Sequence, residues 1–161
     1  MPELQRLRPD HAPALFAFEH ENREYFAKSV PDRGDAYFAE FDTRHVALLA
    51  EQAAGTCHFH VLVDAEGAVL GRVNLVDVAD GEAELGYRIA EGATGRGLAT
   101  DAVRQLCGVA AANYGLTALR AATDADNAGS RAVLERTGFS LMGEVALLPE
   151  GRMEARYFRE L

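Results

Sequence analysis

Residues 87–100 read Tyr87-Arg88-Ile89-Ala90-Glu91-Gly92-Ala93-Thr94-Gly95-Arg96-Gly97-Leu98-Ala99-Thr100. Their order predicts a strand, then a glycine loop, then the first turn of a helix. Glycine allows the backbone to approach a ligand closely, and the first N–H groups of a helix have no partner within the helix. The segment therefore predicts an anion site suited to a phosphate. The alternative is that the glycines only turn the chain.

Two common phosphate-binding loops do not fit this segment. A P-loop requires Gly-x-x-x-x-Gly-Lys-Ser/Thr, and no lysine follows either possible glycine here. The dinucleotide fingerprint Gly-x-Gly-x-x-Gly fits poorly, because Thr100 stands where the third glycine of a match beginning at Gly95 belongs, and the segment follows a run of strands. The phosphate ligand is therefore expected to belong to another class.

The hydrophobic pattern on either side of the loop predicts an α+β chain. Alternating apolar residues and turn signals predict strands at residues 4–7, 57–63, 68–78, 82–90, 118–123, 139–147 and 153–158. Helical spacing and end signals predict helices at residues 10–22, 35–54, 99–114 and 128–137. An antiparallel meander followed by alternating strands and helices predicts a mixed sheet.

Length and composition predict one domain over residues 1–161, since a domain takes roughly 150 residues and 48% of the chain is hydrophobic. Sixteen Lys and Arg against 25 Asp and Glu give a net charge of −9, which argues against nucleic-acid binding. No apolar run approaches the roughly 18 residues of a membrane helix, and no export signal is evident. Two cysteines without CxxC spacing fit a reducing compartment, so we expect a cytoplasmic protein without a membrane partner.

Two segments resemble the GNAT superfamily of N-acetyltransferases. Thr94-Gly95-Arg96-Gly97-Leu98-Ala99 is similar to its acetyl-CoA signature, Gln/Arg-x-x-Gly-x-Gly/Ala, with Thr94 in place of Gln or Arg. Residues 127–140, which begin Asn127-Ala128-Gly129-Ser130 and end Gly138-Phe139-Ser140, resemble the family's later motif. Glu84-Leu85-Gly86-Tyr87 and Ser130 are similar to the RimJ/RimL branch, which acetylates protein N-termini and has relatives that act on other amines.

The resemblance implies a single-domain GNAT-like fold with about seven strands in a mixed, mostly antiparallel sheet flanked by helices. Its fourth and fifth strands, at residues 87–90 and 118–123, are splayed to hold the pantetheine arm of acetyl-CoA. One N–H near Ile89 then points at the thioester oxygen, a contact worth about 3 kcal/mol in the transition state. The implied cofactor-binding residues are Tyr87, Arg88, Ile89, Thr94, Gly95, Arg96, Gly97, Leu98, Ala99, Thr100, Asn127 and Ser130.

The expected chemistry requires a base, because an α-amine with a pKa of about 8 or a lysine at about 10.4 must lose a proton before it attacks. Glu84 is the candidate base, acting through a water; alternatively it is the solvent face of an alternating strand. Many GNAT enzymes have a tyrosine acid seven residues after the motif asparagine, but Leu134 occupies that position here. Ser130 is the candidate acid that replaces it; alternatively its hydroxyl serves the helix start beside Asn127.

We therefore expect an acetyl-CoA-dependent N-acetyltransferase (EC 2.3.1 type) in which a primary amine attacks directly within a ternary complex. A protein N-terminal α-amine and a small amine both stay open as acceptors, and the acidic composition favours a cationic one. The alternatives are a non-catalytic acyl-CoA sensor on the same fold and, third, a structural protein. A homodimer stays open. No metal is expected, because His58 and His60 share a strand face without an evident third ligand.

Overall fold

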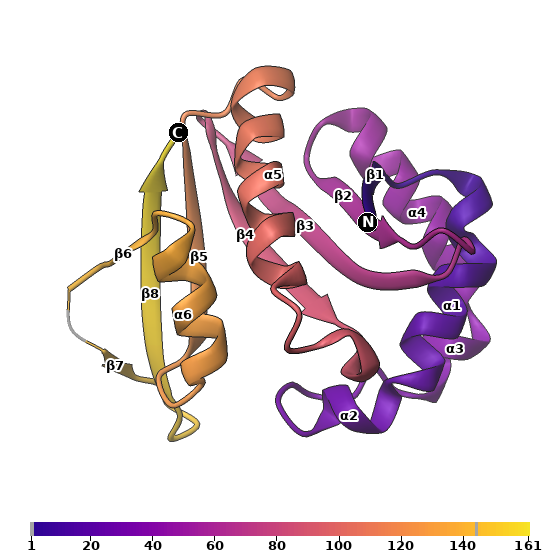
Figure 1. Cartoon of the computed structure of the whole chain (residues 1–161), viewed down its shortest axis with the longest axis horizontal. Helices are drawn as coiled ribbons and strands as arrows, with labels where there is room; N and C mark the ends of the chain where they lie inside the picture. Colours follow the sequence, from indigo (N-terminus) through magenta and orange to yellow (C-terminus); the bar gives the residue numbers. More distant parts are fainter. Residues whose placement is uncertain (1, 144) are drawn as a thin grey trace.

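A mixed sheet with helices on both faces forms the framework of the molecule (Figure 1). The computed structural model describes residues 2–143 and 145–161. Its strands are β1 (Glu3–Arg6), β2 (His58–Val63), β3 (Val69–Ala79), β4 (Glu82–Ile89), β5 (Ala118–Asp124), β6 (Ser140–Leu141), β7 (Ala146–Leu147) and β8 (Met153–Glu160). Its α-helices are α1 (Ala12–Glu21), α2 (Arg23–Ala27), α3 (Asp35–Ala39), α4 (Phe41–Ala54), α5 (Leu98–Asn113) and α6 (Ala128–Arg136). None of the helices in these ranges is long and apolar enough to cross a membrane.

The strand order is β1-β2-β3-β4-β5-β8-β6, and β7 pairs with β8. Every pairing is antiparallel except that of β4 with β5, which is parallel. The parallel pair has only three rungs, the last of which joins Glu84 to Arg120. Both strands continue beyond that rung and diverge (Figure 1). This confirms the expected α+β fold with a splayed pair of central strands.

The alternation of side chains along the strands separates two hydrophobic cores. On β2, Phe59 and Val61 belong to the core under α1 to α4, whereas Leu62 belongs to the core under α5 and α6. α5 contributes the small and branched residues Ala102, Val103, Leu106 and Ala110 to the second core, all fully buried. The periodicity of the sequence predicted this stripe, and Gly115 follows the helix with a positive φ of 64°.

Two elements differ from the prediction. The helix expected over residues 35–54 is divided at Glu40, whose φ of −106° and ψ of 18° leave the helical region. No glycine or proline marks that break in the sequence. The strand expected over residues 139–147 is present as β6 and β7, which pair with β8 at separate places. Glu144, between them, lies outside the described residues.

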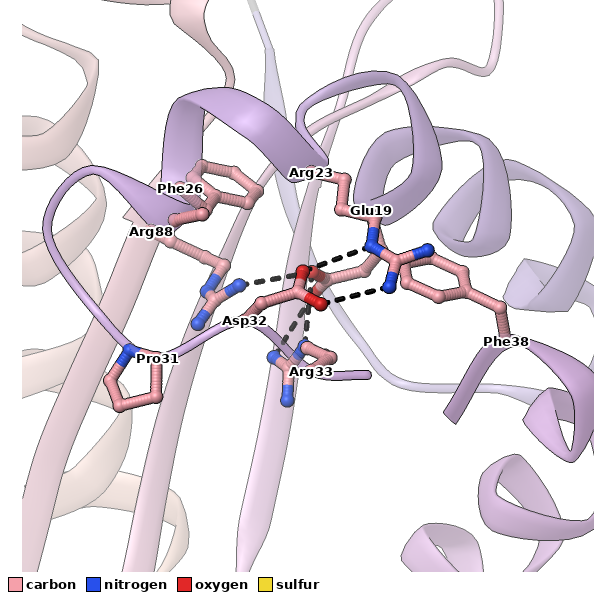
Figure 2. Close-up of a pocket in the computed structure, with 9 residues that line it drawn as sticks. Glu19, Arg23, Phe26, Pro31, Asp32, Arg33, Phe38 and Arg88 are labelled. Carbon is pink, nitrogen blue, oxygen red and sulfur yellow. Dashed lines mark hydrogen bonds and ion pairs between the residues drawn. The ribbon is translucent and has the colours of Figure 1, made fainter. Parts of the chain in front are cut away.

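A buried carboxylate joins α1 to the sheet. Glu19, with a side chain only 1% exposed, accepts hydrogen bonds from Arg33 (3.1 and 3.0 Å), Arg72 (2.8 Å) and Arg88 (3.0 Å). Figure 2 shows Arg33 and Arg88 pointing toward it. Burial would raise the pKa of Glu19, but the hydrogen bond from Arg33 and the charges of Arg72, Arg33 and Arg88 outweigh burial and hold the pKa below its ordinary value. We call Glu19, Arg33, Arg72 and Arg88 the Glu19 cluster.

We expect Glu19→Gln to lower the free energy of unfolding by about 3 to 5 kcal/mol at pH 7, because it leaves the buried Arg72 and the partly exposed Arg33 and Arg88 without their counter-charge. A depressed folded pKa stabilises the protein above the unfolded carboxyl pKa of about 4.3, and this stabilisation is lost as the pH falls through the folded pKa. The difference between wild type and variant in urea denaturation should therefore shrink in acid. Glu21→Gln, an exposed change on the same helix, is the control. Equal stabilities of wild type and Glu19→Gln at pH 7 would show that the Glu19 carboxylate does not stabilise the fold.

Candidate active site

A cleft of about 640 Å³ lies where β4 and β5 diverge. Its walls come from the second half of β4, the glycine loop with the start of α5, the end of β5, and α6 with the loop before it. α2 and the residues after it supply a further wall through Tyr25, Phe26, Ser29 and Val30. The cleft is therefore bordered by the glycine loop and, on the opposite face of the sheet from α5, by α2.

The backbone of β4 borders the cleft with polar groups. Ala90 donates its N–H to the carbonyl of Leu70 on β3 at 2.8 Å. Alternate residues of an antiparallel strand direct their N–H and C=O groups the same way, so the backbone N–H and C=O of Arg88 also point toward β3. The backbone groups of Tyr87 and Ile89 point to the other side, beyond the last rung with β5. An extended ligand can therefore pair with β4 there as an added strand would.

The glycine loop ends in an open helix N-terminus. Gly95 and Gly97 have φ angles of 77° and 73°, and Gly97 is the residue that caps α5. The first helical bond is from Asp101 N–H to the Gly97 carbonyl (3.0 Å), so the amides of residues 98–100 precede the ladder. These residues line the cleft, and apart from its chain neighbours no heavy atom lies within 4 Å of a Cβ placed on Gly97. The geometry fits an anion held by backbone donors.

Two loop side chains are occupied within the loop itself. The Thr94 hydroxyl donates to the carbonyl of Glu91 at 2.8 Å, and the Arg96 guanidinium donates to the carbonyl of Gly92 at 2.6 Å. Thr94 lines the cleft, but Arg96 does not. Of the loop residues predicted to bind the cofactor, Arg96 is thus the one that the structure places outside the cleft lining.

A chain of hydrogen bonds crosses the cleft from α6 to β4. The Asn127 side chain accepts the N–H of Ser130 at 3.1 Å and so caps α6. The Ser130 hydroxyl lies 3.1 Å from the Tyr87 hydroxyl. Burial raises the pKa of Tyr87, and the bond to Ser130 offsets part of that increase. The sequence indicated Tyr87 only for its backbone; its hydroxyl partner is 43 positions away, and no local signal predicts the contact.

Glu84, the predicted base, lies at the closed end of the split. It forms the last rung with Arg120, and it is absent from the cleft lining. Two other carboxylates line the cleft, Asp124 on β5 and Glu154 on β8, which are opposite each other in the β5–β8 register. Neither was predicted from the sequence, and only the pairing of β8 with β5 brings Glu154 to the cleft.

His58 and His60 both contact Tyr114, the residue directly after α5. The His58 ring stacks on Tyr114 at 3.7 Å, and His60 Nε2 lies 2.6 Å from the Tyr114 hydroxyl. Burial lowers the pKa of His60 to about 4. Among the residues that the structure describes, no group of three or more His, Cys, Asp or Glu side chains is placed to hold a metal ion.

The model of the acetyltransferase (GNAT) domain family matches residues 3–140. The chain is 27% identical over 131 residues to the probable N-acetyltransferase YjcK of Bacillus subtilis (strain 168), covering 78% of this chain and 72% of that protein. It matches the ribosomal-protein-S5-alanine acetyltransferase from Vibrio fischeri with a TM-score of 0.92 at 20% identity, over 99% and 92% of the two chains. It matches Mycobacterium smegmatis RimJ in complex with CoA-disulfide with a TM-score of 0.85 at 21% identity, over 98% and 80%.

The structural likenesses, all below 25% identity, concern the fold alone. The family match covers most of the chain, including the split strand pair, the glycine loop and the Asn127 cap. The chain belongs to the GNAT acetyltransferase family.

Proposed function

We propose that this chain, as a single domain over residues 1–161, transfers the acetyl group of acetyl-CoA to a primary amine by direct attack in a ternary complex. The observation that carries the proposal is the edge of β4 left open beyond Glu84, next to the open N-terminus of α5. The Tyr87 and Ile89 backbone would pair with pantetheine, and the amides of residues 98–100 would hold the diphosphate. The N–H of Ile89 would polarise the thioester carbonyl.

The first test is a calorimetric titration with acetyl-CoA, with Gly97→Ala as the variant. A residue with a Cβ at positive φ costs about 1 to 2 kcal/mol, so the loop should shift and the affinity should fall about tenfold. Gly67→Ala is the matched control, because Gly67 also has positive φ (85°) and open space but lies in the turn between β2 and β3. No acetyl-CoA binding by the wild type would refute the proposed function.

A thiol-release assay on the same sample tests turnover with α-amines, polyamines and amino sugars. We expect release of CoA with at least one amine. Acetyl-CoA binding without turnover of any amine would instead favour the non-catalytic sensor. The acceptor amine must lose a proton before attack, and a general base contributes about 10² to 10⁴ to the rate.

We propose Glu84 as that base, acting through a water, because it stands where the strands begin to part. Glu84→Gln should lower kcat by about 10² to 10⁴ with little change in acetyl-CoA affinity. Glu82→Gln is the control, since Glu82 lies two residues earlier on the same strand face and pairs with Arg120 at 3.0 Å. If Glu154→Gln has the large effect and Glu84→Gln does not, the base is on β8.

We propose that Ser130 supplies the proton for the departing CoA thiolate, with Tyr87 as its hydrogen-bond partner. Since a thiol has a pKa of about 8.5, an acid helps only moderately, and Ser130→Ala should lower kcat about tenfold. Tyr87→Phe should have a similar effect if the two hydroxyls act as a unit. The double variant should then have about the same kcat as each single variant. Independent, multiplying effects in this double-mutant cycle would show that the hydroxyls do not cooperate.

A further inference from the structure

The Glu19 cluster contains more positive than negative charge. Its single carboxylate accepts four hydrogen bonds from arginine, which fills the acceptor capacity of the two oxygens. The neighbouring Asp32 is committed to Arg23, which it meets at 2.9 and 2.8 Å. Three guanidinium groups thus share one buried carboxylate, and an excess of like charge favours an additional anion.

Arg88 connects this excess charge to the cleft. Its side chain is 22% exposed, and it lines both the cleft and the small pocket beside Glu19 drawn in Figure 2. It gives only Nη1 to Glu19, and no partner of Nε or Nη2 is found among the residues that the structure describes. Arg72, by contrast, is 6% exposed, and neither it nor Arg33 lines the cleft. Arg88 is therefore the member of the Glu19 cluster that can meet a ligand in the cleft.

The position of Arg88 assigns the anion to the second substrate. The Arg88 guanidinium lies 4.6 Å from the Phe26 ring of α2 and bonds Glu19 of α1, on the face that α1 to α4 cover. α5, whose first amides suit the diphosphate, packs on the opposite face. A diphosphate held there and the Arg88 side chain would therefore lie on different sides of the split strands. Burial lowers the pKa of Arg88, the charge of Glu19 opposes this effect, and the charges of Arg33 and Arg72 add to it.

We infer that the amine acceptor carries a carboxylate, which the Arg88 guanidinium binds while the amine faces the thioester. The inference rests on the proposed function and names its substrate class. A guanidinium fork matches a carboxylate in two parallel hydrogen bonds. The carboxylate belongs to a free amino acid or to an acidic residue close to a peptide N-terminus. This differs from the purely cationic acceptor that the overall charge of −9 favours, because the local excess of arginine acts at much shorter range.

Matched acceptors test this selectivity. Glycine, β-alanine and glutamate are each compared with their amides, and a dipeptide with glutamate second is compared with its glutamine counterpart. For the best acid in this set, the wild-type kcat/KM should be at least ten times the kcat/KM for the corresponding amide. Arg88→Gln should abolish this ratio by raising KM for the acid much more than KM for the amide. Arg88→Lys, which keeps the charge but loses the fork, should restore part of it.

Arg33→Gln is the matched control. Arg33 gives Glu19 two hydrogen bonds and adds to the local charge, but it does not line the cleft, so its loss should lower the ratio of acid to amide clearly less than the loss of Arg88 does. Glu19 keeps Arg72 and one further arginine in either variant, so both should fold. A similar loss of selectivity in Arg33→Gln and Arg88→Gln would show a merely structural effect and overturn the inference.

A binding measurement separates this inference from the proposed function. The N-acetyl derivatives of the same acids and amides are titrated by calorimetry, with and without CoA, so that no turnover is needed. At least one acid should bind tenfold more tightly than its amide, and Arg88→Gln should remove the difference. Equal binding of acids and amides would overturn the inference even in an active acetyltransferase. Preference for the free acids or for the peptide identifies the source of the carboxylate.

Discussion

The short parallel contact between β4 and β5 is the constraint on which the cleft depends. Their three rungs end at Glu84 and Arg120, and each strand is held firmly on its other side. β4 pairs with β3 up to Ile89, and β5 pairs with β8 along its whole length, from Ala118 to Asp124. Closing the split would break one of these ladders, so the N–H and C=O groups beyond Glu84 stay available to a ligand.

The Glu19 cluster attaches β4 to α1 beyond Glu84, where β4 and β5 have separated. Arg88 reaches from β4 to α1, and Arg72 reaches from β3 to the same carboxylate. A buried charge is tolerated when it is fully hydrogen-bonded, and the two oxygens of Glu19 together accept four hydrogen bonds. The same arrangement leaves arginine in excess beside the cleft, so one set of contacts both holds α1 on the sheet and sets the local potential.

Local signals made much of the framework predictable. Gly97 and Asn127 mark helix starts through backbone conformation and capping, and both effects act within a few residues. Contacts between distant residues carried no such signal: Arg88 and Glu19 are 69 positions apart, and Glu154 reaches the cleft only through the β8 register. The break at Glu40 was missed for a different reason, because an ordinary helix former occupies it.

The two substrates are expected to be recognised by different parts of the chain, which explains why one could be inferred from sequence and the other could not. Backbone amides and an open strand edge depend on a few glycines and on the sheet, and the fold that carries them is shared with a structure only 20% identical, at a TM-score of 0.92. The proposed acceptor contacts depend on side chains such as Arg88 and those of α2, which line the cleft and can change without altering the split. Acceptor specificity in this fold can therefore diverge while the acetyl-CoA site stays the same, and we propose that the charge beside the cleft is the feature of this chain that selects its acceptor class.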